Sequence, residues 1–492
     1  MDFEAVIGLE VHAELATTAK IFCGCSTKYG AGPNTQTCPV CLGLPGTLPV
    51  LNEKVVEYCI RAGLALNCRI AGYSKLDRKN YFYPDLPKAY QISQYDLPLC
   101  RDGFLPLASG KTIRITRIHI EEDAGKLIHS AEEERYSLVD YNRTGVPLIE
   151  IVTAPDLATP EEAVEFLEKL RRILMYLGIS DCKMEEGSLR CDANISLKPA
   201  GTPQLGTKTE LKNINSFKAL GRALAYEIER QSELLMEGKA VKQETRKWEE
   251  AKQRTLPLRS KEETQDYRYF PDPDLVPIEL DPAYVAEIAA SLPELPEAKK
   301  RRLIEEYHLP EYDADLITGS KHLADFFEAV LKHYFSPKAA SNWIMGELLR
   351  LMGEAGLTPE DLTVNPAHLG DLLRRIDQGE ISVSQGKNVF ERVFRTGASP
   401  EEIIEAEGIR QISDEAWLRT VVAQVLKDNP QSVGDYLGGK TKAAQFLTGQ
   451  VMRVTKGQAN PQVIKVLLAQ ELAKVRKKTE ETAGLARENK DL

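Results

Sequence analysis

Residues 117–150 carry carboxylates inside apolar, strand-like sequence instead of at loop tips. The segment around residue 150 reads Val-Pro-Leu-Ile-Glu-Ile-Val, so apolar neighbours flank Glu150 on both sides. An ionised carboxylate buried beside Leu and Ile costs several kcal/mol unless a cation or hydrogen-bond donors compensate it. The chain must therefore fold so that a partner reaches Glu150. That partner is either a metal ion that carries a nucleotide or a set of neighbouring Arg and Lys side chains.

Three other segments alternate apolar and polar residues with the period of a half-buried β-strand. Residues 9–15 place Glu10, His12 and Glu14 on one face. Residues 189–196 and 207–212 repeat the pattern with their own polar side chains, among them Arg190, Asp192, Lys208 and Glu210. A sheet of these strands would gather charged side chains on one face. A merely solvated face of an antiparallel sheet gives the same alternation.

The isoleucines of residues 112–122 change parity halfway along the segment, at Ile113, Ile115, Ile118 and Ile120. A β-bulge near Thr116 and Arg117 would bring all four to one face. This parity change leaves open whether Glu121 or Glu122 faces His119.

Helices are expected to cover the apolar face of the sheet. Thr159 as N-cap, Pro160 at the first helical position and Glu162 in a capping box predict a helix that continues to residue 177. A second helix is expected over residues 216–237. Beyond the Pro-rich segment 292–296, nearly all of the chain has helical patterning. The predicted fold class is α+β, with an antiparallel-sheet domain over residues 1–293, an all-α helical domain over residues 294–406 and a small helical tail domain over residues 407–492.

Composition argues against a membrane-spanning or secreted chain. No apolar run approaches about 18 residues, and the N-terminus lacks the features of a signal peptide, so we expect a cytoplasmic protein. The formal net charge of -10 argues against a protein that coats nucleic acid. Residues 410–492 nevertheless carry 14 Lys and Arg against 9 Asp and Glu, a local charge of +5. Such a tail either binds a polyanion or forms a solvated helical surface.

Four of the nine cysteines form two short pairs, Cys23 with Cys25 and Cys38 with Cys41. Two chelating pairs joined by a flexible Gly-Ala-Gly-Pro-Asn segment are typical of a tetrahedral zinc site. We therefore predict a zinc knuckle over residues 23–41, with redox-active or plain thiols as the alternatives. The other five cysteines are expected to be buried as small hydrophobic side chains.

The acidic residues suggest a second metal site, because hard carboxylates with one or two imidazoles suit Mg²⁺ or Mn²⁺. Two further segments, residues 79–95 and 266–274, are dense in aromatic, basic and Pro residues. Such loops can stack on a base or position phosphates, and each is equally typical of a packing loop. The sequence contains neither a Walker motif nor a Rossmann glycine fingerprint, and no signature of a serine or cysteine hydrolase.

Eight motifs closely resemble, in order along the chain, those of the B subunit of the aspartyl/glutamyl-tRNA amidotransferases. They occupy residues 8–12, 79–96, 119–126, 147–151, 185–194, 210–216, 266–272 and 456–461. The resemblance implies a ligase that forms carbon–nitrogen bonds with glutamine as amido donor. It implies that ATP and Mg²⁺ phosphorylate the side chain of Glu or Asp misacylated onto tRNA(Gln) or tRNA(Asn), and that ammonia then displaces the phosphate.

The resemblance also implies a heterotrimer, in which an amidase partner, the A subunit, supplies ammonia and a small C subunit braces the assembly. It implies a catalytic domain similar to glutamine synthetase, a tRNA-binding tail and, in some members, a structural zinc ion. The rival hypotheses are a non-catalytic tRNA-binding scaffold and a stand-alone metal-dependent carboxylate-amine ligase.

Carried over residue by residue, the resemblance predicts magnesium ligands at Glu10, His12, Glu122 and Glu150. Further catalytic candidates are Glu121, Asp192 and Glu210. Arg190 and Lys208 are expected to contact phosphates. Lys79 and Tyr81 are expected to meet the tRNA end or its aminoacyl group.

Overall fold

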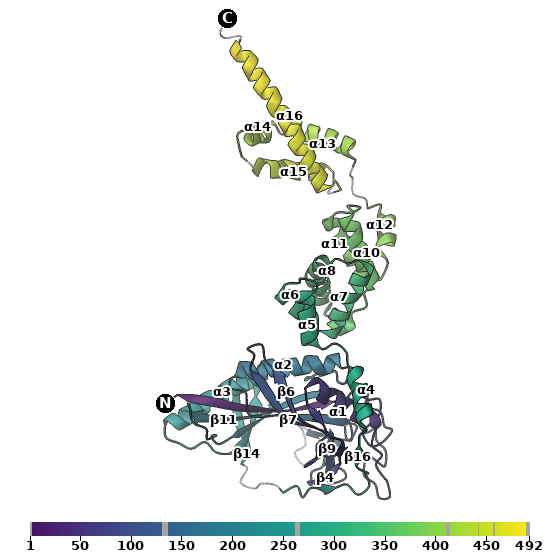
Figure 1. The fold of residues 1–492 in the computed structure, drawn as a ribbon, viewed down its shortest axis with the longest axis vertical. Coiled ribbons are helices and arrows are strands. Elements are labelled where there is room, and N and C mark those ends of the chain that lie inside the picture. The colour runs from purple at the N-terminus through teal and green to yellow at the C-terminus, as the bar shows by residue number, and fades with distance from the viewer. Residues whose placement is uncertain are drawn as a thin grey trace. The chain divides into compact units, whose positions relative to one another are not determined.

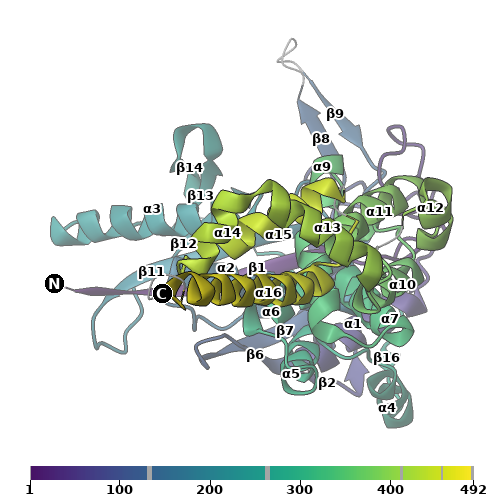
Figure 2. The same ribbon diagram turned by 90° about the horizontal axis from the view of Figure 1, so that it is seen from above.

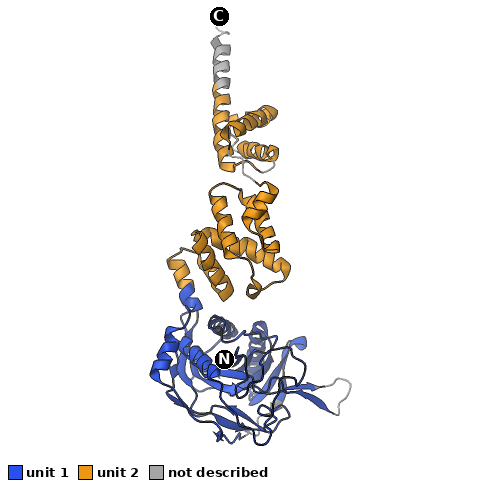
Figure 3. Cartoon of the chain, turned by 90° about the vertical axis from the view of Figure 1, so that its right-hand side faces the viewer, with its two compact units in different colours: residues 1–299 blue, residues 300–492 orange. Residues whose placement is uncertain are grey.

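The computed structural model describes residues 2–129, 136–260, 266–409, 414–440, 442–455 and 458–488. The chain divides into two compact units, residues 1–299 and 300–492, which are coloured separately in Figure 3. The first unit combines a large sheet with helices, and the second is built from helices. The predicted α+β class is therefore confirmed.

A nine-stranded sheet forms the centre of the first unit (Figure 1). Every pair of neighbouring strands is antiparallel except β12 and β13. In sheet order the strands are β14 (Arg254–Ser260), β13 (Glu244–Glu249), β12 (Thr209–Ile214), β11 (Leu189–Pro199), β1 (Phe3–Glu14), β10 (Pro147–Thr153), β7 (Thr112–Glu122), β6 (Cys100–Pro106) and β2 (Arg69–Ile70). The segments with predicted polar side chains thus form five adjacent strands, from β12 to β7.

Helices cover the apolar face of this sheet, as expected from the alternation. They are α1 (Glu53–Ala65), α2 (Pro160–Tyr176) and α3 (Phe217–Met236), and their buried side chains share one core with the inward-facing residues of β1, β7, β10 and β11. Figure 1 shows α2 and α3 along one side of the sheet. Helix α1 is not among the helices that were expected from the sequence. The remaining face of the sheet is left to the polar side chains.

The N-terminus of α2 follows the predicted capping pattern with one difference. The Thr159 side chain accepts a hydrogen bond from the backbone N–H of Glu162, and Pro160 takes the first helical position. The Glu162 carboxylate, however, accepts from the N–H of Ala158, at 2.8 Å, and also binds Lys111. The carboxylate therefore still caps the start of the helix, through a backbone N–H one residue earlier than predicted.

The predicted β-bulge in β7 is confirmed at Thr116. Val152 of β10 pairs with Arg117, but the next residue, Thr153, pairs with Ile115. The skipped residue restores a single buried face for the four isoleucines of β7, all of which are fully buried. The bulge therefore lets one strand place apolar side chains against the helices at both of its ends.

Smaller sheets and helix α4 complete the first unit. The segments 79–95 and 266–274, far apart in sequence, meet where β4 (Asp77–Asn80) pairs with both β5 (Tyr90–Ser93) and β15 (Phe270–Pro271). A second pair joins β3 (Tyr73–Ser74) to β16 (Ile278–Glu279), and α4 spans Pro282–Ala290. The hairpin of β8 (Lys126–His129) and β9 (Ser137–Asp140) projects from the unit in Figure 2.

The unit boundary falls inside α5 (Pro296–Glu305), close to the predicted Pro-rich boundary. The helices that follow are α6 (Glu311–Thr318), α7 (Lys321–His333), α8 (Pro337–Trp343), α9 (Leu349–Ala355), α10 (Pro366–Asp377), α11 (Val383–Thr396) and α12 (Pro400–Glu407). A π-helical turn, Ile344–Leu348, joins α8 to α9. The helical patterning predicted for this region is confirmed, while a separate domain ending at residue 406 stays a prediction.

The last four helices share a core of their own. They are α13 (Glu415–Asp428), α14 (Pro430–Leu437), α15 (Lys442–Val454) and α16 (Pro461–Glu488). Leu418, Leu447 and Ile464 are fully buried in this core. Lys456 and Gly457, which begin the predicted turn before α16, lie outside the described residues.

No described helix is both long and apolar enough to cross a membrane.

Candidate functional site

The polar face of the large sheet carries a transverse row of charged side chains at its centre. His12 on β1 lies opposite Glu150 on β10, and Glu150 lies opposite His119 on β7. On the other side of β1, Arg190 of β11 is in register with His12. Opposed residues of neighbouring strands have Cβ atoms about 5 Å apart. Strand register alone therefore assembles this row.

We call the five side chains Glu10, His12, His119, Glu121 and Glu150 the central cluster. His12 Nε2 lies 3.3 Å from Glu150 Oε2 and 3.4 Å from Glu121 Oε1. His119 Nε2 lies 3.6 Å from Glu150 Oε2 and 3.8 Å from Glu121 Oε2. Glu10 Oε1 is 3.9 Å from His12 Nε2. Two imidazoles thus lie among three carboxylates.

Glu121, and not Glu122, faces His119. The Glu122 carboxylate points to the opposite side of β7, where Lys88 Nζ lies 2.7 Å from Oε2. The backbone N–H of Ile92 donates to Glu122 Oε1 at 2.9 Å. The expectation that Glu122 shares an ion with Glu150 therefore does not fit the structure. Residues 117–122 pair with β10 without interruption, so strand alternation puts Glu121 on the face of His119 and Glu122 on the other face.

Glu150 has several positive partners in the folded chain. Burial opposes its ionisation, yet the charge of His119 and the hydrogen bond from His12 hold the pKa of the Glu150 carboxyl well below its usual range. Arg117 Nη2 lies 3.5 Å from Glu150 Oε1 and acts in the same direction. Glu150 is therefore an anion whose surroundings already contain positive charge.

His12 is the counterpart of this anion. Burial lowers the pKa of the imidazole, but the hydrogen bond to Glu150 and the charge of Glu121 outweigh burial and raise the pKa to about 9. Burial and the charge of Glu150 also raise the pKa of the Glu10 carboxyl. A metal ion bound here would displace the His12 proton, because metal ligation requires the neutral imidazole.

The central cluster has the donors that a hard divalent cation requires. Glu10, His12 and Glu150 form one set whose ligand atoms lie within 4.8 Å of one another, and His119, Glu121 and Glu150 form a second. His119 Nδ1 is buried and has no hydrogen-bond partner among the described residues. Carboxylate oxygens with an imidazole suit Mg²⁺ or Mn²⁺. The residues present fit such an ion.

Asp192 and Glu210 lie beside the central cluster and are held by Lys212, a residue that the sequence did not single out. Lys212 Nζ contacts Asp192 Oδ2 closely and lies 3.3 Å from Glu210 Oε1. The fully buried Thr245 donates a hydrogen bond of 2.7 Å to Glu210 Oε2. Both predicted acids are thus present at the site, oriented by one ammonium group and one hydroxyl.

Arg190 is paired with an acid that the sequence did not assign. Arg190 Nη1 donates to Asp123 Oδ2 at 2.9 Å, and Arg143 Nε lies 3.3 Å from the same oxygen. Burial opposes ionisation of Asp123, but these two guanidinium groups hold its pKa below the usual value. Burial and the charge of Asp123 raise the pKa of the neighbouring Glu14 to about 8.

The two aromatic segments form one wall near the central cluster. Lys79 Nζ lies 5.0 Å from the centre of the Tyr267 ring, and Tyr81 packs edge-on against Tyr267. Tyr95 stacks on Tyr269 with ring centres 4.3 Å apart. Burial lowers the pKa of Lys79, but the charges of Glu121, Tyr269 and Glu150 together outweigh burial, and the net shift is upward. Lys79 and Tyr81 are therefore brought together as predicted from their motif.

Lys208 stands apart from the charged row. It lines an open pocket of about 300 Å³ with Glu10 and Asn194, at the edge of the polar face. Lys88, Asp123 and Lys212 were missed as partners, although all three lie in or beside the recognised motifs. Their pairing depends on strand register and loop packing, which a sequence pattern does not specify.

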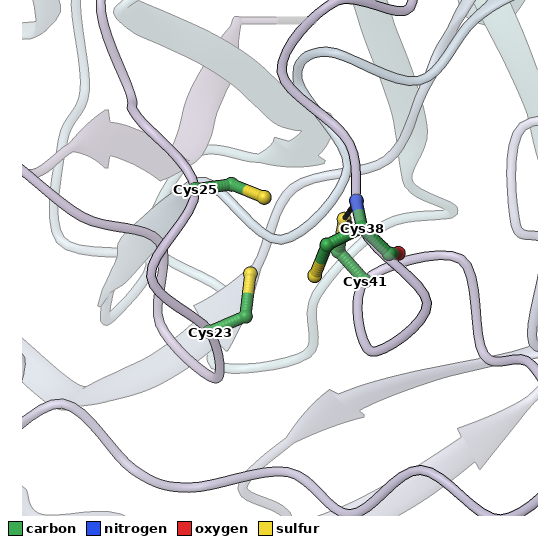
Figure 4. Close-up of side chains that lie close together, drawn as sticks. All are labelled: Cys23, Cys25, Cys38 and Cys41. Carbon is green, nitrogen blue, oxygen red and sulfur yellow. Dashed lines mark hydrogen bonds between the residues drawn. The ribbon is translucent and has the colours of Figure 1, made fainter.

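The four paired cysteines converge in space. Their sulfur atoms lie within 4.8 Å of one another and point into the gap between two loops (Figure 4). Zinc–sulfur bonds of about 2.3 Å in a tetrahedron place sulfurs about 3.8 Å apart, so this spacing fits a zinc ion. The five other cysteines are buried, as expected.

The thiols of the cysteine pairs differ in acidity. The hydrogen bond from Cys23 lowers the pKa of Cys41 to about 4, although burial opposes this shift. Burial raises the pKa of Cys25 to about 11. Lys20 Nζ, at 3.7 Å from Cys41 Sγ, also favours the Cys41 thiolate.

Two family models match the chain, "GatB/GatE catalytic domain" over residues 5–286 and "GatB domain" over residues 325–472. Curated relatives, each named as the B subunit of an aspartyl/glutamyl-tRNA(Asn/Gln) amidotransferase, match over 96% of this chain and 100% of their own length. Among them, the protein of Caldanaerobacter subterraneus subsp. tengcongensis is 60% identical and that of Thermoanaerobacter sp. strain X514 is 61% identical. The chain belongs to this family of amidotransferase B subunits. The resemblance carried by the eight motifs is therefore confirmed.

Family membership places the polar face inside the matched catalytic domain. All five residues of the central cluster and all four paired cysteines fall within residues 5–286. The family match does not assign roles to individual residues. We infer those roles from the geometry of the site.

The raised pKa of His12 predicts an unusual titration. In the metal-free chain, NMR of imidazole-labelled protein should show one histidine titrating near pH 9, and that signal should vanish in a His12→Asn variant. Because the folded pKa exceeds the ordinary value of 6.5, the charged form stabilises the fold fully below about pH 6.5. This stabilisation is lost as the pH rises through about 9. A midpoint at or below 6.5 would contradict the described contacts.

Proposed function

We propose that this chain is the carboxylate-activating subunit of a tRNA-dependent amidotransferase. It would convert Glu on tRNA(Gln), Asp on tRNA(Asn), or both, to the corresponding amide. The observation that carries the proposal is the central cluster, in which a buried Glu150 shares two sets of metal-ligand atoms with His12 and His119. Membership of the B-subunit family supports the substrate class.

The reaction divides into two balanced steps. A side-chain carboxylate oxygen attacks the γ-phosphorus of ATP, and ADP leaves with the electron pair of the broken phosphorus–oxygen bond. Ammonia then attacks the acyl carbon, phosphate leaves, and one proton is released to form the neutral amide. Both steps bring anions together, so catalysis is mainly a matter of positioning and charge compensation.

The proposed magnesium ligands are Glu10, His12, Glu121 and Glu150, with Glu121 in place of Glu122. When bound there, the divalent ion supplies positive charge against the phosphates. The protein adds its own cations around the same face. Lys212 lies beside Asp192 and Glu210, and Arg190 lies beside Asp123. We propose that Arg190, Lys208 and Lys212 receive phosphate oxygens.

The aromatic wall would hold the acceptor end of the tRNA. Lys79 Nζ lies over the Tyr267 ring and within electrostatic range of Glu121 and Glu150, so its ammonium group would meet an incoming carboxylate. Tyr81 packs on the same ring. Stacking of a base on aromatic rings contributes about 1–3 kcal/mol per base in other single-strand-binding proteins.

We propose a structural zinc ion on the four paired cysteines, and ammonia supplied by an amidase partner, the A subunit, in a complex braced by a small C subunit. Helices α13–α16 would contact the tRNA, which their separate core and the local charge of +5 support. A sheet with one helix-covered face and one acidic face supports the proposed likeness to glutamine synthetase.

A non-catalytic tRNA-binding scaffold is the second candidate. The ion pairs that Lys212, Arg117 and Lys88 make with the acids favour it, because each acid already has a protein partner. ATP hydrolysis that depends on Glu-tRNA(Gln) would exclude a scaffold.

Removing ligands of the central cluster should abolish amide formation without affecting ammonia production. With the amidase and the small subunit present, and with ATP, glutamine and Glu-tRNA(Gln), we expect Glu10→Ala and His12→Ala each to lower transamidation at least about 100-fold. Glutaminase activity of the partner should remain. Glu161→Gln, an exposed acid at the start of α2, is the matched control and should keep full activity. Full transamidation in both cluster variants would contradict the ligand assignment.

Deleting residues 410–492 should weaken binding of the tRNA in a salt-dependent way. We expect a raised KM for Glu-tRNA(Gln) and a shallower dependence of log KM on log salt concentration, because fewer phosphate contacts release fewer counterions. The separate core of α13–α16 lets the deletion leave the first unit intact. An unchanged KM for Glu-tRNA(Gln) would contradict tRNA binding by residues 410–492.

A further inference from the structure

Lys20 is a buried cation that the proposed reaction does not use. It follows β1 in the chain, and its side chain is 0% exposed. Among the described residues, Lys20 forms no ion pair with a carboxylate. An isolated ammonium group in a protein interior is strongly unfavourable unless charge and hydrogen bonds compensate it. Its surroundings must therefore explain its presence.

Three acceptors surround the Lys20 ammonium group. Nζ donates to the carbonyl oxygen of Gln36 at 2.7 Å, to that of Tyr141 at 3.4 Å and to Cys41 Sγ at 3.7 Å. An ammonium group has three N–H donors and no acceptor. Every donor is thus matched, and Cys41 is the one partner of the three that can carry a full negative charge.

We propose that Lys20 is part of the metal centre of the four paired cysteines, as the N–H donor and counter-charge to the Cys41 thiolate. The inference rests on the metal-binding role proposed above for these cysteines and is independent of the amidotransferase reaction. A zinc ion with four thiolate ligands has a net charge of −2. One buried ammonium group halves that charge, which favours ligation in a poorly solvated site.

The position of Lys20 also ties the metal centre to the sheet. The backbone of the next residue, Ile21, donates to the carbonyl oxygen of Gly145, just before β10. A Cβ at Gly145 would lie 3.6 Å from Lys20 Cδ and 3.7 Å from Cys41 Cβ, so the loop packs directly on this pair. Gly145 also has a positive φ of 80°, a conformation that favours glycine. Lys20 therefore joins the cysteine loops to the loop that precedes Glu150.

The neighbouring Lys88 provides a matched control. Lys20 and Lys88 line one small cavity together with Cys41 and Glu122. Lys88 is nearly as buried, but it pairs with Glu122 and contacts no thiol among the described residues. Neutralising Lys88 thus removes a buried charge from the same cavity without removing an N–H···S contact.

The test is zinc affinity of the full chain, measured by competition with a chromophoric chelator. Outer contacts to metal ligands contribute about 10–100-fold to affinity, so Lys20→Met should bind zinc about 10–100-fold more weakly than the unmodified chain. Lys88→Met should bind with unchanged affinity. In the cobalt-substituted chain, Lys20→Met should shift the thiolate-to-cobalt charge-transfer band to lower energy, because the lost hydrogen bond makes the thiolate easier to oxidise.

Equal zinc affinity of Lys20→Met and the unmodified chain would overturn the role of Lys20. Failure of the unmodified chain to bind zinc or cobalt would overturn the metal centre itself, a result distinct from loss of transamidation. If Lys20→Met does not fold, Lys20→Gln replaces it. The amide keeps an N–H donor but not the charge, so zinc affinity equal to that of the unmodified chain would overturn the role of Lys20 as counter-charge.

Discussion

The structure of the first unit depends on accommodating Glu150 as an anion at the middle of a sheet. Its strand is apolar on both sides, so the carboxylate is buried and water cannot stabilise it. His12 and His119 approach it from the two neighbouring strands, and Arg117 reaches it from two residue pairs along β7. Removing any one partner would leave a buried charge less compensated, an effect that typically exceeds the value of the contact itself.

The same arrangement explains how the site can serve two states. In the folded chain without nucleotide, protons and protein cations compensate the acids, as the raised pKa of His12 and the contacts of Lys212 indicate. A divalent ion with its nucleotide would replace the His12 proton and free the neighbouring cations for phosphate oxygens. The ion pairs of the protein cations are therefore compatible with the proposed metal site.

The sequence predicts those parts of the site that depend on the alternation of side chains along a strand and on the pairing of neighbouring strands. The alternation around His12 predicted one polar face, and the parity change in β7 predicted the bulge at Thr116, which register then confirmed. The sequence does not predict contacts that are made through loops. The Lys88–Glu122 pair and the triple contact of Lys20 join segments distant in sequence, and neither leaves a periodic signal.

The choice between Glu121 and Glu122 was left open by the sequence, and the register of β7 decides it. The bulge at Thr116 lies before His119, and the strand pairs with β10 without interruption from Arg117 to Glu122, so Glu121 shares the face of His119. In the folded chain Glu121 lies with His12, while Glu122 binds Lys88 on the other side. Glu121 therefore takes the place of Glu122 among the proposed magnesium ligands.

The most direct test of the central claim is the position of bound ions in crystals grown with Mn²⁺ and a non-hydrolysable ATP analogue. Anomalous scattering locates manganese without ambiguity. We expect a peak within about 2.5 Å of the side chains of Glu150 and His12. A polar face without manganese, with His12 still paired to Glu150 while nucleotide is bound elsewhere, would contradict it.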